Sequence, residues 1–141
     1  MTKESAIPVF VYGTLKRGFP NYDESRLGAS FYGKVRSLEA FPLVVANRYY
    51  SPVLIDEPGS GSSVYGELFC VSQSLLDYLD EIESVGRPGG YHRSDIDIRL
   101  ANDEIISAFA YFKYRSDLEV IHSGPLSEYP LDERYVPAER R

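Results

Sequence analysis

The sequence predicts an α+β domain in which a mostly antiparallel β-sheet or barrel packs against a helix. Six segments have the composition or the alternation of β-strands, and one later segment has helical spacing. A chain of 141 residues has the usual length of one domain with one hydrophobic core. We therefore expect a single domain over residues 1–141.

The predicted strands are separated by segments rich in turn-forming residues. In the fifth strand Ile96, Ile98 and Leu100 alternate with charged residues, as a sheet with one solvated face requires. Glycine, proline and serine dominate residues 56–63 and 86–90, which we expect to be surface loops. The six strands are predicted at residues 7–12, 30–38, 42–46, 64–71, 91–100 and 105–114.

The predicted helix covers residues 72–83. Ser72 is a favourable N-cap residue, and the leucines that follow it have helical spacing. At about 100° per residue, Glu83 falls inside the apolar arc of this helix. The arc is formed by Leu75, Leu76, Leu79 and Ile82.

Glu83 is the one carboxylate of this helix expected to point into the protein, because Asp77 and Glu81 lie on the opposite face and Asp80 lies on the border. Desolvation and the negative end of the helix dipole would both raise the pKa of Glu83. A carboxyl group that titrates near neutrality can act as a general acid–base. Alternatively, the helix ends a residue earlier or Glu83 accepts a hydrogen bond from a backbone NH group.

The segment after the first strand is the second candidate site. The apolar run Val9-Phe10-Val11 leads into Tyr12 and Gly13, which predicts a sharp turn after a buried strand. Backbone NH groups in such a turn can bind an anion, aided here by the Thr14 hydroxyl and by the positive charge of Lys16-Arg17. A plain strand-to-loop connection is the alternative. A nucleotide-binding P-loop is excluded, because Phe19-Pro20 stands where Lys-Ser/Thr is required.

Charge and composition narrow the choice of partners. A net charge of −6 argues against nucleic acid and anionic membranes as partners. The sequence has no apolar run of about 18 residues, and residues 1–5 do not resemble a signal peptide, so we expect a cytoplasmic protein. We interpret the single cysteine, Cys70, as a buried strand thiol. The spacing of His92 and His122 predicts no metal site.

Taken together, these segments resemble the γ-glutamyl cyclotransferase superfamily. The resemblance rests on Val9-Phe10-Val11-Tyr12-Gly13-Thr14-Leu15, on Val64-Tyr65-Gly66-Glu67-Leu68-Phe69 and on Leu79-Asp80-Glu81-Ile82-Glu83, with Tyr91 and Arg93 beyond. The γ-glutamylamine cyclotransferase branch is the most similar, on the basis of Pro20-Asn21, residues 38–44, residues 58–61 and the tail from Arg134 to Arg141.

The resemblance implies a small mixed, mostly antiparallel β-barrel of about six strands with flanking helices. It implies that residues Tyr12, Gly13, Thr14 and Leu15 bind the γ-glutamyl group and that Glu83 is catalytic, with no cofactor and no metal. The implied reaction releases the amine of a small-molecule substrate such as ε-(γ-glutamyl)-lysine and forms 5-oxoproline. Tyr91 is a further candidate for substrate contact.

Several alternatives stay open. The chain could act on γ-glutamyl amino acids or peptides, or it could be a non-catalytic small-molecule-binding module. Glu67 is expected to pair with an arginine or tyrosine, Tyr111 to belong to the core and Arg87 to be a solvated loop charge. Tyr22 replaces an expected histidine, and residues 84–90 form a longer loop than usual, which leaves the amine unspecified. The tail, residues 124–141, is either an irregular strap or a frayed end, and the sequence does not indicate the oligomeric state.

Overall fold

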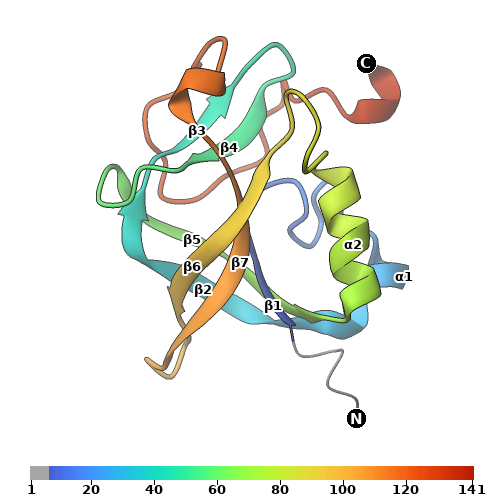
Figure 1. The fold of residues 1–141 in the computed structure, drawn as a ribbon, viewed down its shortest axis with the longest axis vertical. Helices are drawn as coiled ribbons and strands as arrows, with labels where there is room; N and C mark the ends of the chain where they lie inside the picture. Colours follow the sequence, from blue (N-terminus) through green and yellow to red (C-terminus); the bar gives the residue numbers. More distant parts are fainter. Residues whose placement is uncertain (1–6) are drawn as a thin grey trace.

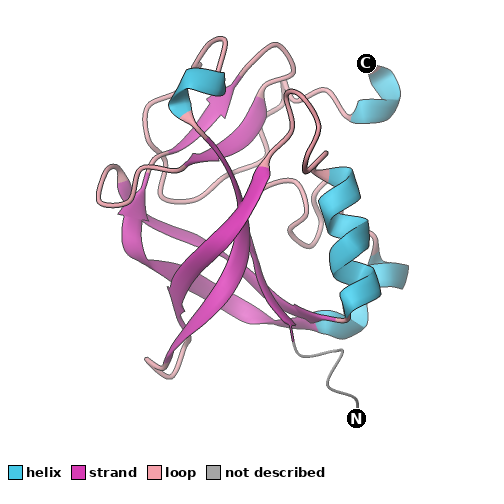
Figure 2. Cartoon of the chain, in the orientation of Figure 1, coloured by secondary structure: helices cyan, strands magenta, loops and turns pink. Residues whose placement is uncertain are grey.

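A computed structural model describes residues 7–141, and its strands wrap into a barrel beside one long helix (Figures 1 and 2). The expectation that the chain does not begin with a signal peptide concerns residues 1–5, and residues 1–6 lie outside the described residues. The strands are β1 (Ile7–Val11), β2 (Phe31–Phe41), β3 (Leu43–Ala46), β4 (Ser51–Ile55), β5 (Ser62–Val71), β6 (His92–Arg99) and β7 (Ile105–Lys113). The helices are α1 (Glu24–Leu27), α2 (Gln73–Ile82) and three short 3-10 turns, at Gly28–Ser30, Arg115–Asp117 and Ala138–Arg140.

Five strands close the barrel in the order β1-β5-β2-β6-β7, and a parallel pairing of β7 with β1 completes the ring. The other pairings within this ring are antiparallel. The expected fold class, a small mixed and mostly antiparallel β-barrel with flanking helices, is therefore confirmed.

Strand β4 is absent from the sequence-based prediction. It is short, it contains Pro52, and it follows a turn in which Asn47 and Tyr50 adopt positive φ values of 66° and 54°. It pairs in parallel with β7 and antiparallel with β3, so β3 and β4 form an extension beside the barrel. Strand β4 matters for the site, because it carries Pro52 close to the end of β1.

Strand β1 is buried on both faces, which explains its unbroken apolar run. Phe10 belongs to the core inside the barrel, together with Ile98 and Phe112. Val9 and Val11 face a second cluster that contains Leu76 of α2. Because β1 is held between these two layers, the turn that follows it starts from a fixed position.

Helix α2 lies against the outside of the barrel, with its leucines facing the cluster around β1 (Figure 1). The Ser72 hydroxyl accepts a hydrogen bond from the Leu75 NH group at 3.2 Å, as an N-cap residue does. The helix proper ends at Ile82, and Glu83 is its C-cap. The helix therefore ends one residue earlier than predicted, and its last turn still positions Glu83.

The tail forms a strap over the end of the barrel. Tyr129 is 0% exposed and lies in the barrel core, and the Val136 NH group donates to the Tyr49 carbonyl at 3.0 Å. The frayed-end alternative is therefore wrong. Cys70 lies in β5, as expected, but it is half-buried where a buried thiol was expected. Partial burial raises the pKa of this thiol.

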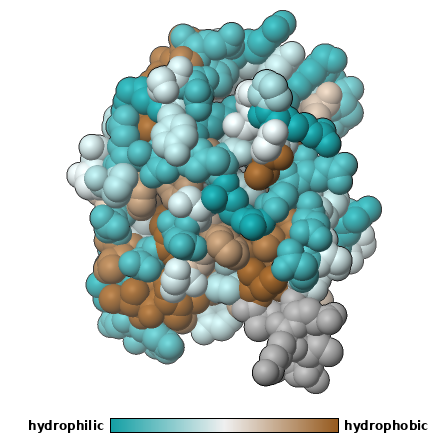
Figure 3. Space-filling view, viewed as in Figure 1, coloured by the Kyte–Doolittle hydropathy of each residue, from teal (hydrophilic) through white to brown (hydrophobic). Residues whose placement is uncertain are grey.

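The outer surface is largely hydrophilic on the face drawn in Figure 3. Apolar residues gather in the lower part of this view, toward the β6–β7 hairpin, where Ile105 is 48% exposed. Within residues 7–141 no helix has both the length and the apolar character needed to cross a bilayer.

Candidate active site

The turn after β1 passes directly beneath Pro52 of β4. A Cβ atom added to Gly13 would lie 2.6 Å from the Pro52 Cγ atom, which is closer than real side chains approach. The sequence pattern suggests that Gly13 serves through its backbone freedom. The structure gives a different reason for the glycine, because Pro52 leaves no room for a side chain at this position. Residues 12–15 are all buried, so this turn is part of the protein interior.

Tyr12 holds the turn against two strands. Its hydroxyl donates to the Tyr111 carbonyl at 2.7 Å and accepts from the Leu54 NH group at 3.2 Å. Burial, and secondarily the negative charge of Glu83, raise the pKa of Tyr12 well above its usual value. The hydroxyl therefore stays protonated, and Tyr12 presents its ring rather than a free OH group to the cavity.

The next three residues supply unused hydrogen-bond donors. Among the described residues, no acceptor engages the backbone NH groups of Gly13, Thr14 and Leu15. Asn21 holds the turn from the side: its amide donates to the Thr14 hydroxyl at 2.7 Å and to the Tyr135 hydroxyl at 3.1 Å. Buried donors without partners favour an anionic or carbonyl ligand at this turn.

Glu83 lines the same cavity as Gly13, Thr14 and Leu15. Part of its side chain reaches the cavity, but the protein around it desolvates the carboxyl group. This desolvation raises the pKa of Glu83 from 4.5 to about 7, against the opposing effect of nearby positive charge. At neutral pH the group is therefore divided between its acid and base forms.

Two cations that the sequence analysis did not single out moderate this pKa. Lys113, at the end of β7, and Arg141, in the tail, each act to lower the pKa of Glu83. The Lys113 ammonium donates to the Gly89 carbonyl at 2.9 Å, which ties it to the glycine-rich loop. Arg141 lies over the Tyr49 ring at 4.2 Å. Lys113 belongs to no recognised motif, and the resemblance of the tail gives Arg141 no role, so only the folded chain places these two cations beside Glu83.

Tyr91 forms another wall of the cavity. Its backbone NH group donates to the Glu83 carbonyl at 3.0 Å, and its hydroxyl donates to the Pro52 carbonyl at 2.7 Å. Burial raises the pKa of Tyr91 well above its usual value. Tyr91 thus connects the end of α2 to β4 and offers its ring to a ligand.

A second carboxylate of α2, Asp80, also turns inward, although its helical angle placed it on the border of the apolar arc. It forms an ion pair with Arg93 and accepts a hydrogen bond from the Tyr111 hydroxyl at 2.7 Å. The expectation that Glu83 is the only inward carboxylate of α2 is therefore wrong. Asp80 is occupied by these two partners and anchors α2 to β6 and β7.

The remaining candidates lie elsewhere. Glu67 accepts a hydrogen bond from the Arg17 backbone NH group at 2.8 Å and lies 3.8 Å from the Arg17 guanidinium group, in agreement with the expected pairing with an arginine. The Tyr22 hydroxyl donates to Glu24 at 2.6 Å, and Arg87 is exposed in its loop. Within residues 7–141, no group of three or more potential metal ligands comes together.

The cavity has a narrow inner part and a wider outer part. The inner part has a volume of about 30 Å³ and the outer part about 510 Å³, and Thr14, Pro52, Glu83 and Tyr91 line both. Lys113 and Arg141 line the outer part. The arrangement can hold a small polar group at the turn, exchange a proton through Glu83 and place a larger substituent in the outer part.

Comparisons with known proteins identify the family of this chain. A family model described as "Gamma-glutamyl cyclotransferase, AIG2-like" matches residues 9–128. The γ-glutamylaminecyclotransferase of Homo sapiens is 36% identical over 152 residues, which cover 94% of this chain and 98% of that protein. γ-Glutamylaminecyclotransferase A of Danio rerio is 37% identical over 129 residues, covering 87% and 79% of the two chains.

A solved structure has a similar fold over nearly the whole chain. The crystal structure of an AIG2-like protein from Mus musculus superposes with a TM-score of 0.81 at 32% identity, covering 96% of this chain and 98% of that one. The chain belongs to the AIG2-like γ-glutamyl cyclotransferase family, a family of cyclotransferase enzymes.

Proposed function

We propose that this protein is a γ-glutamylamine cyclotransferase, which converts a γ-glutamyl amine such as ε-(γ-glutamyl)-lysine into 5-oxoproline and the free amine. The names of its relatives support this activity. The observation that carries it is the position of Glu83, which lines the same cavity as residues 13–15 with their unengaged NH groups. The pKa of Glu83, at about 7, suits a group that exchanges protons at neutral pH.

The first step is a proton transfer followed by ring closure. Glu83 takes a proton from the substrate α-ammonium, and the freed nitrogen attacks the γ-carbonyl carbon. The new C–N bond closes a five-membered ring and leaves a tetrahedral carbon with a negatively charged oxygen. Because the nucleophile belongs to the substrate, the protein needs no nucleophilic serine or cysteine. Holding the substrate in its reactive conformer can lower the activation barrier by up to about 7–11 kcal/mol.

The second step breaks the original amide bond. Protonated Glu83 gives its proton to the leaving nitrogen, the carbonyl of 5-oxoproline re-forms, and the amine departs. The Glu83 carboxylate then removes the second proton of the ring nitrogen and passes it to the departing amine, which leaves as an ammonium ion, so Glu83 returns to its starting form. Such a shuttle requires a group that is readily both protonated and deprotonated at working pH, which a pKa of about 7 provides. General acid–base catalysis of this kind typically contributes about 10²- to 10⁴-fold.

The turn and Tyr91 serve to orient the substrate. We assign the NH groups of Gly13, Thr14 and Leu15 to the glutamyl end of the substrate, where they would stabilise its α-carboxylate or the developing oxyanion. The Tyr12 and Tyr91 rings would enclose the same end, because both line the inner cavity. The leaving amine would then occupy the outer cavity, beside Lys113 and the glycine-rich loop.

A substrate panel tests this function. The full chain is incubated with ε-(γ-glutamyl)-lysine, with γ-glutamyl amino acids and with glutathione, and 5-oxoproline is measured. Preferred turnover of ε-(γ-glutamyl)-lysine is the expected result. Turnover of γ-glutamyl amino acids or glutathione alone would assign a different substrate to the same chemistry. If no substrate gave 5-oxoproline, the enzymatic function would be rejected and a non-catalytic binding module would be the remaining hypothesis.

A further inference from the structure

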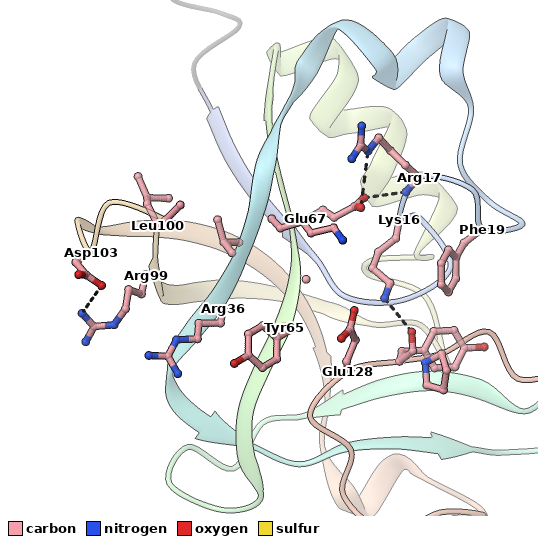
Figure 4. A pocket seen from close by; sticks show the side chains of 16 residues that line it. Lys16, Arg17, Phe19, Arg36, Tyr65, Glu67, Arg99, Leu100, Asp103 and Glu128 are labelled. Atoms are coloured by element: carbon pink, nitrogen blue, oxygen red, sulfur yellow. Dashed lines mark hydrogen bonds and ion pairs between the residues drawn. The ribbon is translucent and has the colours of Figure 1, made fainter.

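A second cavity, of about 870 Å³, shares no lining residue with the cavities around Glu83 (Figure 4). We call it the basic groove. It lies on the outer side of β2 and β5, between residues 16–19, residues 99–103 and residues 128–130. Its volume is in the range of small-molecule sites.

Positive charge gathers in this groove, although the chain carries a net charge of −6. Two of its cations are occupied: the Lys16 ammonium donates to the Tyr129 carbonyl at 2.8 Å, and Arg17 is bound through its backbone and side chain to Glu67. Five basic side chains and three acidic ones line the groove: Lys16, Arg17, Lys34, Arg36 and Arg99, with Glu67, Asp103 and Glu128.

Arg36 and Arg99 form a like-charged pair. They lie directly opposite each other in the antiparallel register of β2 and β6, and like charges in such a pair destabilise a sheet. Figure 4 shows both guanidinium groups extending from the same end of the groove. Arg99 is 3.8 Å from Asp103, whose side chain is 85% exposed, so this contact neutralises little charge.

Two of the three remaining cations are unengaged. Within the described part of the chain, no hydrogen bond or ion pair involves the side chains of Lys34 and Arg36. Lys34 precedes Arg36 by two residues on β2, so both side chains extend from the same face of the strand. An anion bound here would meet at least three positive charges and would relieve the repulsion between Arg36 and Arg99.

An exposed aromatic ring lies beside these cations. Tyr65 is opposite Arg36 in the register of β2 and β5, and it is 47% exposed. Figure 4 places the Tyr65 ring between Arg36 and the Glu128 carboxylate. Such a ring can stack on a planar base, and a carboxylate next to it can accept a hydrogen bond from an amino group of that base.

We propose that the basic groove binds a polyphosphate-bearing ligand, with Arg36 and Arg99 holding the phosphate groups and Lys34 adding charge. The planar guanidinium group matches phosphate oxygens with two parallel hydrogen bonds, and two such groups side by side suit a chain of linked phosphates. Tyr65 provides the face on which the base of a nucleoside triphosphate stacks.

Calorimetric titration of the full chain at low ionic strength tests the proposal. The probes are ATP, inorganic tripolyphosphate and adenosine. ATP and tripolyphosphate are expected to bind one to one, with affinity that falls as salt is added. Arg36→Gln and Arg99→Gln should each weaken binding by about tenfold or more, whereas Arg140→Gln, an exposed arginine outside the groove, should not change it.

The pattern of results identifies the ligand or rejects the site. Tighter binding of ATP than of tripolyphosphate, lost in Tyr65→Ala, would assign a nucleotide; equal binding would assign inorganic polyphosphate. Binding of adenosine alone, no binding of either polyphosphate, or binding that persists in the Arg36→Gln/Arg99→Gln double variant would overturn the proposal. Unliganded Arg36→Gln should unfold at the same or a higher temperature, because it removes repulsion; a large fall in its unfolding temperature would make Arg36 a structural residue instead.

Discussion

The carboxyl group of Glu83 is in an environment that stabilises its neutral form. It is desolvated at the end of α2, and the two cations that oppose this effect, Lys113 and Arg141, lie in the wider outer cavity. An ionised Glu83 therefore destabilises the folded protein while making the base available. This opposition between stability and activity is common at catalytic groups.

Glu83→Gln should stabilise the protein in a pH-dependent way. The native pKa of about 7 is above the unfolded value of 4.5, so the folded state binds more protons between these two values. The free energy of unfolding of the native sequence therefore falls as pH rises through this window. At pH 8 Glu83→Gln should be more stable by on the order of 3 kcal/mol, and at pH 4 the two should be about equally stable. Urea unfolding at both pH values measures the difference; equal stability at pH 8 would contradict the raised pKa.

Lys113→Met should move the pH dependence of turnover. Removing this cation leaves Glu83 with less opposing charge, so the pKa of Glu83 should rise further. The acidic limb of kcat/KM should then shift to higher pH by up to about one unit. Lys34→Met removes the same charge from the surface of β2 and is the matched control. An unshifted limb in Lys113→Met would show that Lys113 does not act on the catalytic group.

At the scale of elements, the site depends on how closely β4 approaches the turn after β1. Gly13→Ala would place a Cβ atom 2.6 Å from the Pro52 Cγ atom. We expect a loss of about 1–3 kcal/mol in the free energy of unfolding, together with a fall in kcat as the turn is displaced. Gly33→Ala, in β2, is the matched control, because no atom lies within 4 Å of the added Cβ.

A double variant separates a steric cause from a conformational one. If Pro52 is the obstacle, Pro52→Ala should restore part of the stability lost in Gly13→Ala, because it removes the Cγ atom that the new methyl group meets. If Gly13→Ala is as stable as Gly33→Ala, the close approach of β4 to the turn is not a constraint on this position.

At the scale of the molecule, the tail closes the barrel core. Tyr129 is fully buried and packs against the Phe19 ring at a centroid distance of 6.0 Å. Tyr129→Ala should lower the free energy of unfolding by about 3–5 kcal/mol, as large-to-small changes in a core do. Tyr32→Ala, at a tyrosine that is 58% exposed, should cost much less. Equal effects of the two changes in chemical denaturation would mean that the tail does not belong to the core.

Local patterns in the sequence predicted most of the fold. The apolar run of β1, the alternation in β6 and the cap and leucine spacing of α2 each depend on neighbouring residues, so they could be recognised without the rest of the chain. Strand β4 could not, because it is short, contains Pro52 and is stabilised by parallel pairing with β7. The closure of the barrel by β1 and β7 likewise depends on residues far apart in the sequence.

The candidate site was predictable to the same extent. Glu83 and the turn at residues 12–15 could be named because each belongs to a segment with a recognisable pattern. Pro52, Lys113 and Arg141 come from three other parts of the chain and meet the site only in the folded structure. The inward turn of Asp80 escaped prediction because its partners, Arg93 and Tyr111, lie on β6 and β7.

The rate of 5-oxoproline formation by Glu83→Gln tests the central claim most directly. The variant keeps the size and shape of the side chain and cannot exchange a proton near neutral pH. With ε-(γ-glutamyl)-lysine at saturation, kcat should fall by about 10²- to 10⁴-fold while the protein stays folded. Activity in Glu83→Gln equal to that of the native sequence would contradict the assignment of Glu83 as the general acid–base.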